Sequence, residues 1–199
     1  MTYILASGSP RRREMLSHLG LDFRVCVADA DETSDERDGA ALVELLSARK
    51  AQAVRDRLTR AGEWNGETVI IAADTVVVDS SGEILGKPRD EADAARMLRA
   101  LSGNTHRVIS GVAVMLGERL ATSHEVTEVT FSHLSDALIA RYIASGEPMD
   151  KAGAYGIQDT AALWISGIKG DYFNVVGLPV HRLEMLLQQN FGLSLWKNG

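Results

Sequence analysis

The chain has 199 residues, of which 45% are hydrophobic and 24% charged, a composition typical of a soluble globular protein with a sizeable core. Its 21 basic and 27 acidic residues give a net charge of -6, which argues against binding to a nucleic-acid polymer. No apolar run is long enough to span a membrane, and Cys26 is the only cysteine, which excludes an internal disulfide framework. We therefore expect a cytoplasmic protein without a membrane partner.

The chain begins with a short apolar strand, predicted at residues 3–6, followed by a helix over residues 14–19. Gly20 is a suitable stop for this helix. Before the helix, Ser9 is a good N-cap and Pro10 suits the first helical position. The helix therefore starts close to the end of the strand.

The first turn of this helix is basic, although the helix dipole disfavours cations there. It contains Arg11, Arg12 and Arg13, and Ser7 and Ser9 precede it. Guanidinium groups, hydroxyls and free backbone N–H groups would converge at this point, which favours a site for a phosphate chain. The alternatives are a solvated basic surface or a nucleic-acid patch, and the acidic net charge argues against the latter.

The elements in the first half of the chain follow from hydrophobic periodicity and turn signals. We predict a strand at 23–27, an acidic loop at 29–36, a helix at 40–58, a strand at 69–78, a hairpin turn at 79–82, a returning strand at 84–85, and a helix from the Asp90 cap to about 101.

The second half continues the same alternation. We predict strands at 107–115 and 121–131, a helix from the Ser135 cap to near 146, a loop at 147–158, strands at 161–165 and 173–176, and a last helix from Pro179 to about 190. Interleaved strands and helices with hairpins in mid-chain predict an α/β fold with a mixed sheet. No linker or repeat divides the chain, so we expect a single domain over residues 1–199.

Asp74 is a charged residue inside the apolar strand predicted at residues 69–78. An ionised carboxylate buried in a strand costs several kcal/mol unless it is paired or metal-bound. One reading places Asp74 at a strand end or bulge, bonded to backbone N–H groups. The reading that we favour makes Asp74 a metal ligand or general base, because both flanks are apolar and Ala72 and Ala73 leave room for a ligand.

Two lysines are candidate phosphate ligands. Lys50 shares a helix face with Leu46, Val54 and Leu58, so it is either a lysine at the edge of the apolar stripe or a cation directed into the site. Lys87 lies in a turn between Gly86 and Pro88. A turn lysine is usually plain surface, and its candidacy rests on the other cations of the phosphate site.

A divalent metal is the expected cofactor, because a polyphosphate site rich in Arg and Lys still needs a metal for hydrolysis. Mg²⁺ is commonly held by one or two carboxylates together with phosphate oxygens. Glu32, in the acidic loop, and Asp74 are the candidate ligands. The chain has neither a P-loop motif nor a dinucleotide-binding motif, and its five histidines show no zinc-ligand spacing.

Five sequence blocks resemble the Maf family of nucleoside triphosphate pyrophosphatases, in the family's order and over nearly the whole chain. They are residues 6–12 (ASGSPRR), 73–77 (ADTVV), 86–88 (GKP), 150–158 (DKAGAYGIQ) and 176–179 (VGLP). The block at 150–158 resembles the branch that acts on dTTP and UTP.

The resemblance implies an inosine-triphosphatase-like fold, with an elongated mixed sheet, flanking helices and two lobes around a cleft, often in a homodimer. It implies dependence on Mg²⁺ or Mn²⁺ and cleavage between the α and β phosphates. It also implies that Asp74 is the proton acceptor, that Arg11, Thr75 and Gln158 govern substrate choice, and that Glu32, Lys50 and Lys87 line the cleft. The family is further linked to septum formation in cell division and to the clearing of modified nucleotides.

The chain departs from the family pattern at Asp159, where Gly commonly follows the Gln. A carboxylate beside the presumed base-reading Gln158 could alter base preference. Two alternatives to a dTTP and UTP pyrophosphatase remain at this point. One is a pyrophosphatase for 7-methyl-GTP or another modified nucleotide, and the other is a nucleotide-sensing regulator of septum formation with little catalysis.

Overall fold

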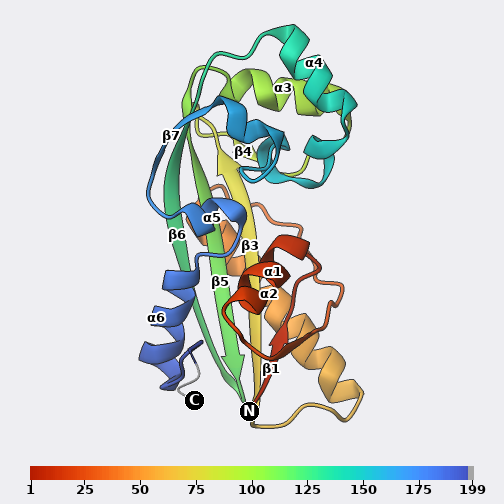
Figure 1. The fold of residues 1–199 in the computed structure, drawn as a ribbon. Helices are drawn as coiled ribbons and strands as arrows, with labels where there is room; N and C mark the ends of the chain where they lie inside the picture. The colour runs from red at the N-terminus through yellow and green to blue at the C-terminus, as the bar shows by residue number, and fades with distance from the viewer. Residues whose placement is uncertain (197–199) are drawn as a thin grey trace. The chain divides into compact units, whose positions relative to one another are not determined.

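The computed structural model describes residues 1–196, and their contacts divide the chain into two compact units (Figure 1). The first unit contains Met1–Asp74, Ser110–Glu125 and the chain from Gly177 onward. The second unit contains Thr75–Ile109 and Val126–Val176. Each unit has an apolar core of its own.

The strands are β1 (Thr2–Leu5), β2 (Phe23–Val25), β3 (Thr68–Val78), β4 (Ile84–Leu85), β5 (Thr105–Leu116), β6 (Arg119–Phe131) and β7 (Ile165–Lys169). Their order in the sheet is β2-β1-β3-β5-β6-β7, and β4 pairs with β3. Strand β1 is parallel to β2 and β3, whereas β4 is antiparallel to β3 and β7 is antiparallel to β6. The predicted α/β fold with a mixed sheet is confirmed.

The first unit contains the helices α1 (Pro10–His18), α2 (Gly39–Arg60) and α6 (Val180–Phe191). Its core joins Ala51, Val54 and Leu58 of α2 to Ile4 and Ile70 of the sheet. Helix α2 also approaches β5 closely at a glycine, since a Cβ on Gly111 would lie 2.4 Å from the carbonyl oxygen of Val43. The glycine therefore permits the close packing of the long helix that carries Lys50.

The second unit contains α3 (Glu91–Leu101), α4 (Asp136–Ala144), α5 (Tyr172–Val176) and three short 3₁₀ helices, η1 (Glu147–Asp150), η2 (Ala152–Ala154) and η3 (Thr160–Trp164). Helices α3 and α4 pack against each other (Figure 1). Both have the predicted N-caps, because the side chains of Asp90 and Ser135 accept hydrogen bonds from the first turns of α3 and α4.

Two predicted strands are wrong. Residues 161–165 fall mostly in η3, with a strand only from Ile165 onward, and residues 173–176 belong to α5. Short apolar runs have no periodicity that separates strand from helix. Tertiary contacts decide the outcome, because the buried Asn174 of α5 donates hydrogen bonds to the carbonyl of Val108 and the hydroxyl of Thr127.

Within residues 1–196, no helix has both the length and the apolar character needed to cross a bilayer.

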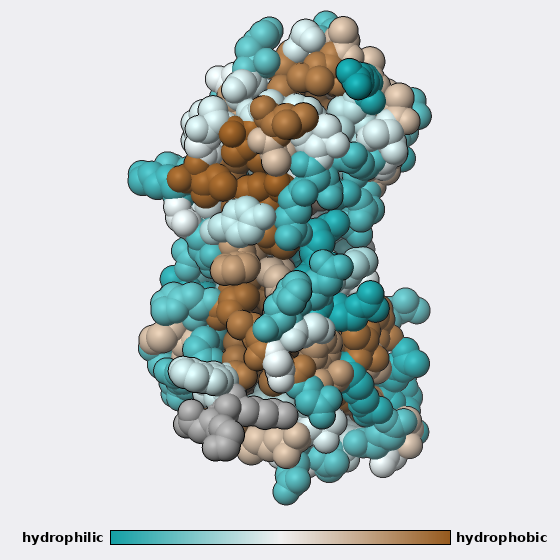
Figure 2. All heavy atoms as spheres, viewed as in Figure 1, coloured by the Kyte–Doolittle hydropathy of each residue, from teal (hydrophilic) through white to brown (hydrophobic). Residues whose placement is uncertain are grey.

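Figure 2 shows that the viewed face carries hydrophobic side chains between larger hydrophilic areas. The exposed apolar side chains of the second unit include Leu163, Ile168 and Phe173.

Candidate active site

Asp74 lies inside β3, where ten of the eleven residues, Asp74 among them, are buried. The strand forms because β-branched and small apolar residues surround Asp74, and its first half pairs with β1. The aspartate is therefore in the interior of a strand and not at its end. A carboxylate in this position needs a compensating cation or hydrogen bonds.

The compensating cation is Lys50 of α2. Its Nζ lies 2.5 Å from Oδ1 of Asp74 and 3.1 Å from Oε1 of Glu32. The side chains of Lys50 and Asp74 are mostly buried, whereas that of Glu32 is largely exposed. The two acids predicted from the sequence to be metal ligands thus both pair with the ammonium group of Lys50.

The guanidinium group of Arg12 fixes the backbone next to Asp74. Its Nη1 donates to the carbonyl of Ala73 at 2.9 Å and to Oγ of Ser7 at 3.1 Å, and its Nε donates to the carbonyl of Gly177 at 2.7 Å. Arg12 therefore joins the start of α1 to β3 at the residue that precedes Asp74. A positioning role thus accompanies the predicted phosphate contact.

The predicted helix start is confirmed at Ser9, which is the N-cap residue of α1 with Pro10 in the first turn. The Ser9 hydroxyl makes no capping hydrogen bond, however, and its backbone N–H donates instead to Oγ of Ser7 at 3.3 Å. The first turn also lacks an acidic residue. The positive end of the helix is therefore offset neither by this hydroxyl nor by a carboxylate of its own first turn, which suits an anion site.

Burial and the neighbouring charges affect the pKa of the Arg12 guanidinium group. Burial lowers the pKa of Arg12, the negative charge of Asp74 opposes this effect, the positive charge of Arg11 adds to it, and Glu32 again opposes it. Arg11, Arg12, Asp74 and Glu32 therefore share one electrostatic environment.

The donor set of Glu32 and Asp74 fits a hard divalent cation, since both supply carboxylate oxygens and both already hold one positive charge in common. Among residues 1–196, no group of three or more His, Cys, Asp or Glu side chains is arranged to hold a metal ion. Mg²⁺ is commonly held by one or two carboxylates together with phosphate oxygens of a substrate.

The three remaining predicted site residues lie in the second unit. Thr75 follows Asp74 in β3 and is half-buried, whereas Lys87 and Gln158 are exposed. The segments that carry Lys87 and Gln158 are held together, because the N–H of Gly153 in η2 donates to the carbonyl of Gly86 at 3.0 Å. A Cβ on Gly153 would lie 2.8 Å from Val77, and its φ of +67° also requires glycine.

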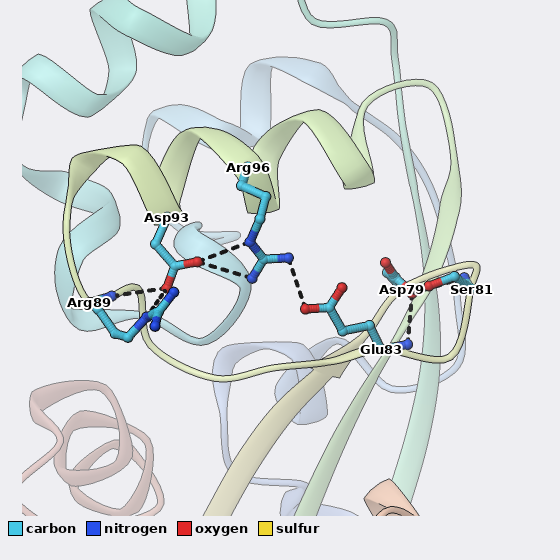
Figure 3. A network of polar contacts seen from close by, with 6 residues as sticks. All are labelled: Asp79, Ser81, Glu83, Arg89, Asp93 and Arg96. Atoms are coloured by element: carbon cyan, nitrogen blue, oxygen red, sulfur yellow. Dashed lines mark hydrogen bonds and ion pairs between the residues drawn. The ribbon is translucent and has the colours of Figure 1, made fainter.

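A polar network anchors the chain that follows the Lys87 turn (Figure 3). Both the backbone N–H and Nε of Arg89 donate to Oδ2 of Asp93, and Arg96 binds Oδ1 of Asp93 and also Glu83. The hydrogen bonds from Arg89 are the main reason that the pKa of Asp93 falls to about 2. This network fixes the path from β4 to α3, on which Lys87 lies.

A family model described as Maf-like protein matches residues 2–190. This chain belongs to the Maf family. Its curated relatives include a dTTP/UTP pyrophosphatase of Symbiobacterium thermophilum, 49% identical over 98% of this chain and 97% of the relative. Another of that name, from Moorella thermoacetica, is 50% identical over 97% of this chain and 96% of the relative. A third, from Alkaliphilus metalliredigens, is 47% identical over 96% and 97%.

In this Maf-family chain, sequence reasoning missed Lys151 as a structural centre of the Gln158 segment. Its Nζ is buried and binds the carbonyl of Glu147 at 2.6 Å, Asp150 at 2.8 Å and Asp159 at 3.3 Å. A Cβ on Gly156 would lie 2.7 Å from the Lys151 side chain and 2.4 Å from the Asp159 carboxylate. The Lys-x-x-x-x-Gly spacing was present in the sequence, but it does not reveal the folded-back lysine.

Proposed function

We propose that this chain is a pyrophosphatase that hydrolyses dTTP and UTP to the nucleoside monophosphate and pyrophosphate. The observation that carries the proposal is the convergence of Glu32 and Asp74 on Lys50, in a chain about half identical to relatives named dTTP/UTP pyrophosphatase. Charge-paired acids beside arginines, one of them the buried Asp74, are the chemistry that metal-assisted phosphoanhydride cleavage needs.

Glu32 and Asp74 are the residues that would hold a divalent cation, Mg²⁺ or Mn²⁺. Such an ion, when bound, neutralises charge on the phosphate oxygens and lowers the pKa of a bound water. The proton transfer from the attacking water is assigned to a side chain of the protein. Asp74 accepts a proton from the attacking water, whose oxygen bonds to the α phosphorus as the bond to the bridging oxygen of the β phosphate breaks.

Cationic and polar groups bind the substrate in this proposal. Arg11, Arg12 and Lys50 offset the negative charge of the triphosphate in the first unit, and the hydroxyls of Ser7 and Ser9 lie at the same helix start. Lys87 contributes a further cation from the second unit. Charge that develops on the pyrophosphate leaving group is stabilised by such fixed cations.

Base choice is assigned to Arg11, Thr75 and Gln158. The amide of Gln158 has a donor and an acceptor that match the O4 and N3–H edge shared by uracil and thymine. Gln158 is exposed, so the amide is accessible to a ligand.

The test is a pyrophosphate-release assay on the purified protein, across the common nucleoside triphosphates and 7-methyl-GTP, with Mg²⁺ or Mn²⁺. Fast release from dTTP and UTP is expected. Preferential release from 7-methyl-GTP would replace the proposed substrate class. Nucleotide binding without release would instead identify a sensor, and the proposal would be wrong.

A further inference from the structure

The loop that carries Glu32 is irregular and exposed. It connects β2 to α2, and between residues 29 and 38 it has no helix or strand. Hydrogen bonds within the loop include short-range ones, such as the one from the Thr33 N–H to the Asp31 side chain. A metal ligand on such a loop would have to be ordered when the ion binds, and that ordering costs affinity.

Arg49 holds this loop on both sides of Glu32. One guanidinium nitrogen, Nη1, donates to the carbonyl of Asp31 at 3.1 Å and to the carbonyl of Thr33 at 2.7 Å. These are the residues immediately before and after Glu32. Charged donors to carbonyl oxygens form stronger hydrogen bonds than neutral donors.

Arg49 also connects Glu32 to the rest of the site, because it is adjacent in α2 to Lys50, which binds Glu32 and Asp74. Neighbouring residues in one turn of α2 therefore hold both the backbone of the Glu32 loop and the carboxylates of Glu32 and Asp74. That helix is set against the sheet by the close approach at Gly111.

We propose that Arg49 is a positioning residue that presents the Glu32 carboxylate for divalent-cation binding. This inference rests on the proposed function, in which Glu32 is a metal ligand. Arg49 acts through the backbone of the loop and has no contact with the substrate in this role. Removing it should therefore weaken cation binding and leave the chemical step unchanged once the metal is saturating.

The test measures Mn²⁺ binding by the EPR signal of free Mn²⁺, in the full chain with a non-hydrolysable α,β-methylene analogue of UTP. Arg49→Ala is expected to weaken Mn²⁺ binding about tenfold or more, as loss of supporting residues around a metal commonly does. Arg49→Lys should recover part of the affinity. Arg55→Ala is the matched control on the same helix, because Arg55 pairs with Asp56 and Glu118 and not with the Glu32 loop.

Activity provides a second readout. Raising Mn²⁺ should restore the kcat of Arg49→Ala to near the original value, whereas Glu32→Gln should stay impaired. Thermal unfolding midpoints of the variants confirm that they are folded.

Three results separate the inference from the proposed function. If Arg49→Ala binds Mn²⁺ normally while Glu32→Gln does not, the role of Arg49 is wrong and the metal assignment stands. If Glu32→Gln also binds normally, both are wrong. If the binding pattern holds but the protein hydrolyses neither dTTP nor UTP, the positioning role stands and the proposed function falls.

Discussion

The Nζ atom of Lys50 lies 2.5 Å from Oδ1 of Asp74, so a lysine from α2 compensates a carboxylate inside an apolar strand. Both side chains are largely removed from water, and the same ammonium also binds Glu32 at 3.1 Å. The arrangement keeps the Asp74 carboxylate, the proposed proton acceptor, at a fixed place in the sheet. It also gathers two carboxylates that, without Lys50, would repel each other.

Asp74→Asn should abolish turnover and preserve nucleotide binding. The amide keeps the size of the side chain but cannot accept the proton of the attacking water, and loss of such a group commonly lowers kcat by about 10² to 10⁴. The measurement is kcat for UTP together with the affinity for a non-hydrolysable analogue. Asp56→Asn, on an exposed face of α2, is the control, and full activity of Asp74→Asn would refute the assigned role.

Lys50→Met should destabilise the metal-free protein, because two neighbouring carboxylates lose their shared cation. We expect a cost of about 2 kcal/mol, which for a chain of this length lowers the melting temperature by about 4–8 °C. Added Mg²⁺ should recover more stability in the variant than in the original protein. Lys169→Met breaks an exposed pair with Glu128 and serves as the control, with an expected change of less than about 1 kcal/mol. Equal melting temperatures for Lys50→Met and the original protein would contradict this reading of the pair.

Asp159→Asn should lower kcat/KM for dTTP and UTP by a similar factor and leave the ratio of the two unchanged. The reason is that the Asp159 carboxylate lies 3.3 Å from Nζ of the buried Lys151, where it supports the loop that carries Gln158. The measurement is kcat/KM for each nucleotide in parallel. A changed preference among bases would show instead that Asp159 acts on the base.

Acid should destabilise the second unit through His106. Burial lowers the pKa of His106 from 6.5 to about 4, partly opposed by the charge of Asp79. The unfolded chain therefore binds this proton at a higher pH than the folded chain does. Stability is lost as the pH falls from about 6.5 to about 4, with a total of about 3 kcal/mol.

The variant that tests this expectation is His106→Gln, which removes the titrating group and retains a partner for the hydroxyl of Tyr155, now 2.8 Å from Nε2 of His106. Urea unfolding between pH 7 and 4.5 should show a shallower loss of stability in this variant. His133→Gln, at an exposed position, should follow the original protein. The same slope in all three proteins would exclude His106 as the cause.

Most of the local structure could be predicted because its signals are local. The N-caps at Asp90 and Ser135, the hairpin that pairs β3 with β4, and the Ser9-Pro10 helix start each depend on a few adjacent residues. The prediction failed at the segments of η3 and α5, where short apolar runs suit strand and helix equally well and packing decides between them.

The sequence by itself determined that Asp74 is a charge in an apolar strand and that three arginines occupy the first turn of a helix. It also determined that the five family motifs occur in the family's order along the chain. These features follow from composition, spacing and order along the chain. Only the tertiary structure decided that Lys50 binds both Glu32 and Asp74, that Arg12 reaches the carbonyl of Gly177, and that Arg49 flanks Glu32. The physical reason is that these partners are distant in sequence, and sheet order and helix packing bring them together.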